Sequence, residues 1–220
     1  MRASSKVNDD CMAEFEALIR PGITEKEMAE AIRGIYAAHG CSGVSFPPIC
    51  GFGAHAADPH HDNDDTPLEA GQCVLIDVGG VYQNYCSDMT RTFFTGEPSE
   101  EERKVYELVR QAQAAAEALV KPGVRLCDID AAARDLITEA GYGPYFNHRL
   151  GHFIGLEDHE AGDVSAVNEK VVTPGMCFSI EPGIYLPGKF GVRIEDLVLV
   201  TEDGCEVLNH YPHELRVHPF

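Results

Sequence analysis

The chain has few basic residues and no long apolar run, and each lack narrows what the protein can do. Lysine and arginine number 17 against 36 aspartate and glutamate residues, so the formal net charge is −19. Nucleic acids and anionic membranes bind basic patches, so this charge argues against both as partners. No apolar stretch approaches the length of a membrane span, and the first six residues hold no signal-peptide core. A cytoplasmic location is the default expectation.

Closely spaced cysteine pairs are also missing. None of the eight cysteines forms a CxxC motif, and a chain of 220 residues can bury a real hydrophobic core without disulfide staples. Several, such as Cys73 and Cys177, lie in apolar runs, where a free cysteine behaves as a small hydrophobic residue. We therefore expect reduced, structural cysteines. No low-complexity tract or linker interrupts the sequence, which favours a single domain over residues 1–220.

Helical patterns fill two parts of the chain, each ahead of strand-like apolar runs. Apolar residues recur at helical spacing over 6–19, 24–40, 99–119 and 129–140. The second and third of these begin with capping boxes, Thr-Glu-Lys-Glu and Ser-Glu-Glu-Glu, in which side chains satisfy the first backbone donors of a helix. The segment 46–67 is rich in proline, glycine, histidine and aspartate, and is expected to be loop with short extended pieces.

Four acidic residues stand within or directly after runs that are otherwise typical of buried strands. An acid in a strand interior is costly unless it is paired or bound to a cation. Two such acids close together would suggest a metal site or an acid/base pair. The runs and their acids are 73–78 with Asp77, 85–94 with Asp88, 177–180 with Glu181, and 192–200 with Glu195.

The chain also resembles itself at a separation of just over one hundred residues. The segments 71–79 and 175–183 keep a turn glycine, an acid and a following glycine in register. We interpret this as an internal repeat of two halves, approximately 7–100 and 101–210, with chance similarity of two generic strands as the alternative. Two such halves facing each other would bring the four acids together at a pseudo-two-fold axis.

Four carboxylates packed together would repel one another and have raised pKa values, and two divalent cations would relieve that repulsion. Oxygen ligands favour Mn²⁺, Mg²⁺ or Ca²⁺, and an added imidazole moves the preference toward Mn²⁺, Fe²⁺, Co²⁺ or Zn²⁺. A histidine donor is available in His148-Arg-Leu-Gly-His152. Two metals about 3.5–4 Å apart can activate a bridging water and polarise a carbonyl.

These residues resemble the five metal ligands of the pita-bread metallopeptidases, the family of methionine aminopeptidase, aminopeptidase P and prolidase. The resemblance extends from the first helix to about residue 208. It implies an α+β fold of two pseudo-symmetric halves, with a curved, mainly antiparallel sheet covered by helices. The matching motifs are Asp77, Asp88 in Ser-Asp-Met-Thr-Arg-Thr, His152 in Gly-His-Phe-Ile-Gly, Glu181 in Glu-Pro-Gly-Ile-Tyr, and Glu195 in Val-Arg-Ile-Glu-Asp.

Other positions are similar to the branch of the family that cleaves Xaa-Pro bonds. Phe46-Pro-Pro-Ile followed by Asp58-Pro-His60-His61 resembles the prolidase loop whose first histidine faces the substrate. Arg193, two residues before Glu195, is typical of the Xaa-Pro enzymes. The resemblance therefore implies a metal-dependent Xaa-Pro dipeptidase or aminopeptidase that acts on short proline-containing peptides.

The resemblance also implies a role for each metal ligand. Asp88 and Glu195 would bridge two divalent metal ions, with manganese ahead of cobalt, zinc or iron. Asp77 would complete the coordination of one ion, and His152 with Glu181 that of the other.

Catalytic and substrate-binding roles follow from the same resemblance. Glu181 would carry a proton from the attacking water to the proline nitrogen, which in the peptide bears no hydrogen. His159 and Arg193 would stabilise the reacting centre and hold the substrate, and His60 would assist from the substrate side. His148 resembles a further substrate-binding histidine of the pocket.

Individual residues keep simpler interpretations. Asp77 could be a strand-edge residue, His60 a solvated surface residue, and Arg193 the partner of a nearby acid. His148 and His152 have the spacing of a helical zinc pair, but the glycines around them oppose a helix. We assign no role to His55, and Gly-Phe-Gly at 51–53 lacks the full dinucleotide-binding fingerprint.

Three other functions remain as alternatives. A methionine aminopeptidase is opposed by Arg193 and the Pro-His-His loop, and a creatinase-like amidinohydrolase would not need the metal ligands. A non-catalytic binding module would have lost ligands, whereas all five are present. Prolidases usually carry an additional N-terminal domain, which we expect to be absent, because residues 1–6 already resemble the start of the first helix. A natural short form, a fragment, a monomer and a homodimer all stay open.

Overall fold

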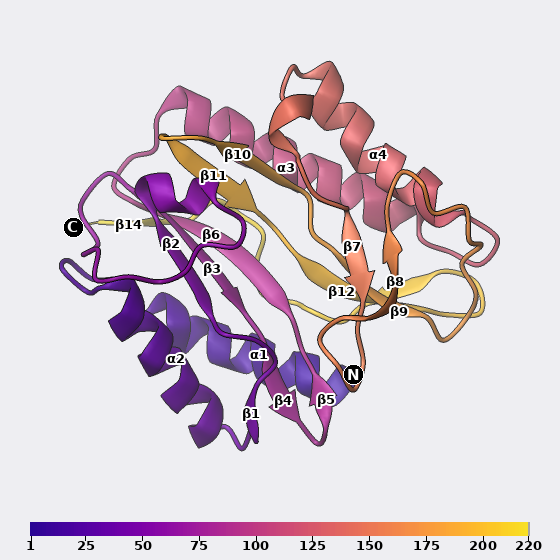
Figure 1. Ribbon diagram of the computed structural model, residues 1–220, viewed down its shortest axis with the longest axis horizontal. Coiled ribbons are helices and arrows are strands. Elements are labelled where there is room, and N and C mark those ends of the chain that lie inside the picture. Colours follow the sequence, from indigo (N-terminus) through magenta and orange to yellow (C-terminus); the bar gives the residue numbers. More distant parts are fainter. Residues whose placement is uncertain (220) are drawn as a thin grey trace.

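Two helix pairs lie toward opposite ends of the molecule, with β-strands between them (Figure 1). The computed structural model describes residues 1–219. One pair is α1 (Arg2–Glu16) and α2 (Glu25–Ala38), and the other is α3 (Glu100–Leu119) and α4 (Leu126–Glu139). These four helices confirm the predicted ones, although α1 and α4 begin earlier than expected. The capping boxes at Thr24 and Ser99 are both formed.

The first half of the chain builds a four-stranded sheet in the order β14-β6-β3-β2. Strand β3 pairs antiparallel with both β2 and β6, and β14, from the C-terminal end of the chain, pairs parallel with β6. The strand bounds are β2 (Ile49–Phe52), β3 (Cys73–Val78), β6 (Met89–Thr95) and β14 (Val217–His218).

The second half builds a five-stranded antiparallel sheet in the order β13-β12-β9-β7-β8. The predicted turn at 201–204 joins β12 to β13, and the Thr201 N–H donates to the Gly204 carbonyl at 2.9 Å. The strand bounds are β7 (Gly151–Phe153), β8 (Glu160–Val164), β9 (Cys177–Ile180), β12 (Asp196–Val200) and β13 (Cys205–Val207).

Each half also contains a hairpin between its two acid-bearing segments. In the first half β4 pairs with β5 and with the short β1, and in the second half β10 pairs with β11. Short 3₁₀ helices, η1 and η2, precede β3 and β7. The bounds are β1 (Gly43–Val44), β4 (Gly80–Tyr82), β5 (Tyr85–Cys86), β10 (Gly183–Leu186), β11 (Phe190–Arg193), η1 (Gly53–Ala57) and η2 (Gly143–Tyr145).

The continuous strands predicted over 85–94 and 192–200 are wrong. Asp88 lies in the break between β5 and β6, and Glu195 lies in the break between β11 and β12. At each break the chain passes from the hairpin into the main sheet, so the strand pairing changes there. The Glu195 N–H donates to the carbonyl of Thr90, in β6, at 3.2 Å. The break in one half is therefore bonded to a strand of the other.

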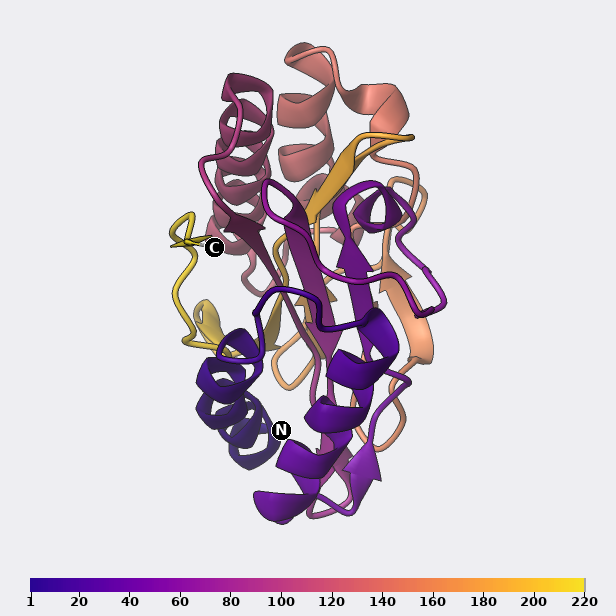
Figure 2. The ribbon, with the colours of Figure 1, turned by 90° about the vertical axis from the view of Figure 1, so that its left-hand side faces the viewer.

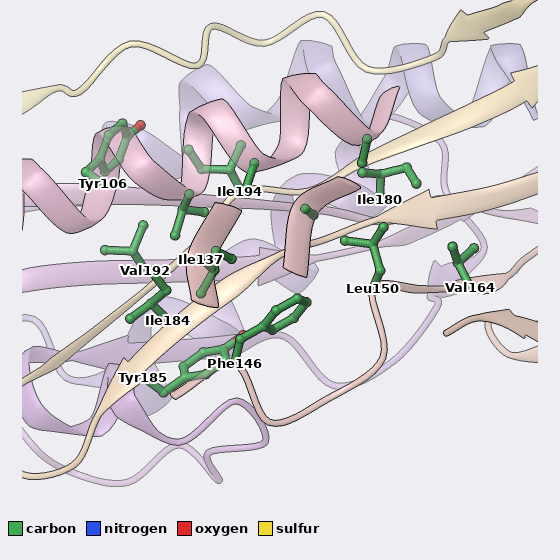
Figure 3. Packing of buried hydrophobic residues seen from close by; sticks show 14 of the residues in the cluster. Tyr106, Ile137, Phe146, Leu150, Val164, Ile180, Ile184, Tyr185, Val192 and Ile194 are labelled. Carbon is green, nitrogen blue, oxygen red and sulfur yellow. The ribbon is translucent and has the colours of Figure 1, made fainter. Parts of the chain in front are cut away.

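Two hydrophobic clusters correspond to the two halves. Val74 and Ile76 of β3 pack with the apolar faces of α1 and α2, whereas Phe178 and Ile180 of β9 pack in the second cluster, with α3 and α4. Figure 3 shows this second cluster around Ile180. Leu75, on the opposite face of β3, belongs to the second cluster. The view along the edge of the sheets shows the strands running between the helix pairs (Figure 2).

The alternation of side chains along β3 sets the direction of Asp77. Successive side chains of a strand point to opposite faces, so Asp77 shares the face of Cys73 and Leu75 and points toward the second half. All eight cysteines are free, as predicted. Within residues 1–219 the longest helices are too short or too polar to cross a membrane.

Candidate active site

A cavity of about 560 Å³ is lined by residues from both halves of the chain. It brings together all nine residues that the sequence suggested as ligands, catalysts or substrate contacts. These are His60, Asp77, Asp88, His148, His152, His159, Glu181, Arg193 and Glu195. The acids come from the ends or breaks of strands, where the backbone turns away and leaves the side chains facing the cavity.

The four acids are largely buried and have few hydrogen-bond donors. Asp77, Asp88 and Glu195 are between 1% and 8% exposed. Glu195 Oε2 accepts from Thr90 Oγ1 at 2.6 Å, and Glu181 Oε1 accepts from Ser179 Oγ at 3.0 Å. Within the described residues, Asp77 Oδ1, Asp88 Oδ1 and Glu195 Oε1 are buried and have no hydrogen-bond partner.

His152 is held by β7 with one ring nitrogen toward the acids. Its backbone N–H donates to Ser179 Oγ at 2.9 Å, and Nδ1 lies 3.2 Å from the Phe153 carbonyl oxygen. Nε2 lies 3.2 Å from Asp88 Oδ2 and 3.6 Å from Glu181 Oε1. Because residues 151–153 form a strand, the helical zinc-pair alternative is wrong.

Burial and mutual repulsion change the acidity of these groups. Burial, followed by the charges of Glu195 and Asp77, raises the pKa of Asp88 well above its usual value. Burial raises the pKa of Glu181 to about 7 and, more than any other cause, that of Glu195 well above its usual value. Burial lowers the pKa of His152 to about 3, so its imidazole is neutral and able to donate a lone pair to a metal.

The residues fit a divalent metal centre. One donor atom each from Asp88, His152 and Glu195 lies within 4.8 Å of the others. Buried carboxylate oxygens without donors are costly in a metal-free protein, and cations would satisfy them. Oxygen-rich ligation with one imidazole suits metals such as Mn²⁺, Fe²⁺, Co²⁺ or Zn²⁺.

Arg193 is buried and committed to three partners. Its Nη2 donates to Asp77 Oδ2 at 2.6 Å, its Nε to Thr90 Oγ1 at 3.0 Å, and its Nη1 to the Tyr185 hydroxyl at 2.9 Å. Its side chain is only 3% exposed. This arrangement agrees with the simpler interpretation of Arg193 as the partner of a nearby acid, while the residue still lines the cavity.

The other predicted histidines surround the acids at different depths. His148 is half-buried, and its Nε2 lies 2.8 Å from the Tyr185 hydroxyl. Burial lowers the pKa of His148 to about 3. His159 is exposed, with its ring edge-on to that of His152 at 4.2 Å between centroids. His60 is exposed at the cavity edge, in the loop after η1.

His55, for which we predicted no role, belongs to a cluster around the fully buried Glu25. His55 Nδ1 lies 2.9 Å from Glu25 Oε1, and His61 Nε2 lies 2.6 Å from Glu25 Oε2. Glu25 also accepts from the backbone N–H groups of Phe52 and Asp64. The cluster therefore fixes the loop that carries His60.

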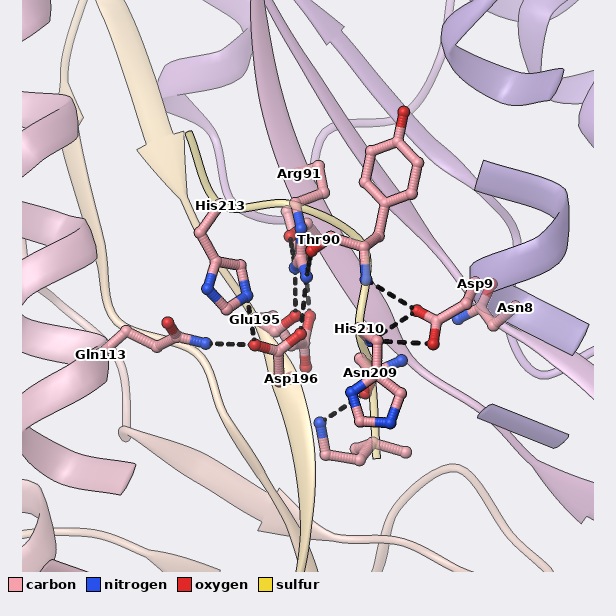
Figure 4. A network of polar contacts seen from close by, with 12 residues as sticks. Asn8, Asp9, Thr90, Arg91, Gln113, Glu195, Asp196, Asn209, His210 and His213 are labelled. Atoms are coloured by element: carbon pink, nitrogen blue, oxygen red, sulfur yellow. Dashed lines mark hydrogen bonds and ion pairs between the residues drawn. The ribbon is translucent and has the colours of Figure 1, made fainter. Parts of the chain in front are cut away.

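A second unpredicted network supports the backbone at Glu195 (Figure 4). The Arg91 guanidinium donates to the Glu195 carbonyl and to Asp196 Oδ1, each at 2.7 Å. Asp196 Oδ2 accepts from Gln113 Nε2 at 2.7 Å and lies 2.6 Å from His213 Nε2. The signal for this network was present in the sequence, because Arg91 and Asp196 belong to the same two motifs as Asp88 and Glu195.

Comparison with known proteins shows a consistent set of relatives. Residues 1–202 match the model of metallopeptidase family M24. A dipeptidase PepE structure from Mycobacterium ulcerans is 45% identical, with a TM-score of 0.97. The match covers 100% of this chain and 59% of the length of that structure's chain. An Xaa-Pro dipeptidase from Bacillus anthracis is 39% identical with a TM-score of 0.96, covering 98% of this chain with 61% of its own.

Two further relatives agree with these. A prolidase from Pyrococcus furiosus is 40% identical with a TM-score of 0.93, covering 95% of this chain with 62% of its own. An uncharacterized peptidase of Staphylococcus aureus is 46% identical over 211 residues, which are 96% of this chain and 60% of the relative. The chain thus spans about three fifths of the length of the proteins that it matches.

Proposed function

The chain belongs to metallopeptidase family M24 and has its α+β pita-bread fold, and from this premise we propose that it is a dinuclear-metal exopeptidase. The proposed reaction is hydrolysis of the Xaa-Pro bond of dipeptides or short peptides. The observation that carries the proposal is the convergence of four acids and one neutral imidazole on a single cavity, with three buried carboxylate oxygens that have no donor among residues 1–219. The Xaa-Pro dipeptidase and prolidase among the similar structures support the choice of substrate.

Five residues would hold the cations, for which Mn²⁺ is the proposed identity. Asp88 and Glu195 come from the strand breaks of the two halves and are proposed as the bridging pair. Asp77 would complete one position, and His152 with Glu181 the other. When bound, such a metal pair supplies an activated water and a polarised substrate carbonyl.

Glu181 is the proposed proton carrier. In the metal-free protein, burial raises the pKa of Glu181 to about 7. A bound cation would lower that pKa, so the carboxylate would be ionised and able to accept a proton from the water. Ser179 Oγ donates to Glu181 Oε1, which limits the orientations of the carboxyl group. Glu181 would take a proton from the attacking water and deliver it to the proline nitrogen. That delivery matters because the nitrogen of an Xaa-Pro bond carries no hydrogen of its own.

The remaining proposed roles concern the substrate. His60 and His159 are exposed on separate loops at the cavity, so both can hydrogen-bond to a peptide that enters it. His148 would contact the substrate from a deeper position beside Tyr185. Arg193 would act chiefly by holding Asp77 in position, since its guanidinium is already bonded to that carboxylate.

The direct test is metal analysis followed by a peptide assay. After loading with Mn²⁺ or Co²⁺, the chain is incubated with Ala-Pro and, in parallel, with a peptide that begins with methionine. We expect about two metal ions per chain and hydrolysis of Ala-Pro. Cleavage of the methionine peptide alone would establish the methionine aminopeptidase alternative. Absence of both metal and hydrolysis would favour a non-catalytic binding module.

A further inference from the structure

Asp158 is an acid of the cavity that the proposed reaction does not use. It lies in the loop between β7 and β8, and its side chain is 17% exposed. Its Oδ1 is buried and, within residues 1–219, has no hydrogen-bond partner. Its Oδ2 lies 3.6 Å from Nδ1 of His159, which is longer than a hydrogen bond. Because Asp158 lines the cavity and its side chain is partly exposed, a group that enters the cavity can reach the carboxylate.

Among residues 1–219, Asp158 has no hydrogen-bonded cationic partner. Burial, followed by the charge of Asp77, raises the pKa of Asp158 to about 7, and the charge of Arg149 opposes this rise. Arg193, one of two arginines that line the cavity, is paired with Asp77, and the other, Arg149, is exposed. Asp158 is not among the five proposed metal ligands, so bound cations would leave its carboxylate without a direct partner.

The loop that carries Asp158 is fixed to its neighbours. The Gly155 carbonyl accepts from the Cys86 N–H at 2.8 Å, and Glu160 Oε1 accepts from the Leu156 N–H at 2.8 Å. The first bond ties the loop to β5, and the second closes the loop across Asp158. A buried carboxylate that is held without a partner is costly, and a cation brought by a ligand would offset that cost.

We propose that Asp158 binds a protonated amine of the peptide substrate and thereby sets a specificity of this chain. The inference rests on the proposed Xaa-Pro hydrolysis and adds a recognition residue to it. The amine has two sources in a dipeptide: the side chain of a basic residue before proline, and the free α-amino group. Both present the same alkylammonium chemistry, so the experiment must separate them.

A comparison of lysyl-proline with norleucyl-proline distinguishes the side-chain amine from the α-amino group. The two side chains differ by a terminal ammonium and are otherwise close in shape. The kcat/KM of both substrates is measured for the wild type, Asp158→Asn and the control Glu157→Gln. Glu157 is exposed outside the cavity lining, so the control removes the same charge from the adjacent position. Circular dichroism and metal content verify that each variant is folded and loaded.

If the side-chain ammonium binds, the wild type prefers lysyl-proline, and Asp158→Asn lowers the lysyl-to-norleucyl ratio by roughly 10- to 100-fold. If the α-ammonium binds, Asp158→Asn lowers kcat/KM for both substrates by a similar factor. In that case hexanoyl-proline, which is norleucyl-proline without its amine, should inhibit the wild type and Asp158→Asn equally well. The Glu157→Gln control should match the wild type throughout.

Two results would overturn the inference. One is equal kcat/KM values for Asp158→Asn and the wild type on both substrates. The other is a loss on both substrates accompanied by weaker inhibition by hexanoyl-proline, which would indicate general damage to the cavity. A failure of the proposed function is distinct, because the metal-loaded wild type would then hydrolyse neither norleucyl-proline nor Ala-Pro.

Discussion

The two halves of the molecule share a strand order but supply different chemistry to the cavity. Strand β2 pairs with β3 as β7 pairs with β9, and Phe52 lies opposite Val74 as Phe153 lies opposite Phe178. One residue earlier the two strands differ: the first half has a glycine, Gly51, and the second has His152. A Cβ atom at position 51 would lie 2.9 Å from the Ala56 Cα in η1. Close packing of η1 thus excludes a side chain there, and at this strand position only the second half can offer an imidazole.

The acids at the ends of β3 and β9, Asp77 and Glu181, also differ between the halves, in the groups that they contact. Asp77 is held in an ion pair by Arg193, at 2.6 Å. Glu181 has a hydroxyl donor, Ser179, and a pKa raised to about 7 by burial. One acid is therefore suited to fixed binding and the other to proton exchange. On the proposed assignment, both halves supply metal ligands and the second alone supplies the proton carrier.

The largest expected effect comes from Glu181→Gln, which removes the proton carrier but keeps the shape of the side chain. We expect kcat on Ala-Pro to fall by about 10³-fold, the range of general acid–base catalysis, while the fold is retained. Steady-state kinetics with Mn²⁺-loaded protein measures the change. Turnover equal to that of the wild type would remove Glu181 from the proton-transfer role and weaken the contrast with Asp77.

The next effect concerns the histidine present in one half only. His152→Ala should lower the affinity for at least one metal ion by more than the roughly 10–100-fold typical of outer-shell changes. Competition against a fluorescent chelator gives the affinities. His39→Ala is a matched control, because His39 pairs with Glu14 outside the cavity lining. Metal binding that is unchanged in His152→Ala would show that the imidazole is not a ligand.

Removing the metal should make the stability of the chain depend on pH. The folded-state pKa values of Asp88 and Glu195 lie above their usual range, and that of Glu181 is about 7. At these carboxyls the folded state binds more protons than the unfolded state between about pH 4.5 and 7, so they lower the unfolding free energy as pH rises. The pKa of His148 and that of His152 are lowered to about 3, so these two groups oppose the trend below about pH 6.5, but the three carboxyls outnumber them. For Glu181 the change is roughly 3 kcal/mol.

Urea denaturation of chelator-treated protein at a series of pH values measures this trend. Metal loading should reverse it over the same window, because metal binding requires ionised carboxylates and strengthens as they lose their protons. A metal-free protein whose stability rises steadily from pH 5 to 7 would contradict the predicted repulsion among the acids.

The smallest effect tests the packing that excludes a side chain from β2. Gly51→Ala should destabilise the fold by about 1–3 kcal/mol, because the added Cβ meets backbone atoms of Ala56 rather than a mobile side chain. Gly34→Ala is the control, since a Cβ at this helical position meets nothing within 4 Å. Thermal unfolding gives both values. Equal stability of Gly51→Ala and the wild type would mean that η1 adapts, and that sterics do not explain the missing histidine.

Much of the architecture could be predicted because its signals are local. The capping boxes at Thr24 and Ser99 and the apolar runs of β3 and β9 all rely on neighbouring residues. The strand break at Glu195 could not be predicted, because residues 192–200 contain no glycine or proline and the break depends on the bond to Thr90 from the other half.

The residues of the candidate site also fall into those with a local sequence signal and those without one. Asp77 and Glu181 stood out because acids at the ends of apolar strands are unusual. The burial of Glu25 was not predictable, since it depends on His55 and His61, some thirty residues later in the chain. Asp158 carried no signal either, because an aspartate in a polar loop is ordinary until the surrounding fold buries it.

The central claim is that the two halves together hold two cations between Asp77, Asp88, His152, Glu181 and Glu195. The most direct measurement is an anomalous difference map from a crystal soaked in Mn²⁺. We predict two peaks about 3.5–4 Å apart, both in contact with Asp88 and Glu195. A single peak touching the ligands of one half, or peaks confined to the Glu25, His55 and His61 cluster, would contradict the account.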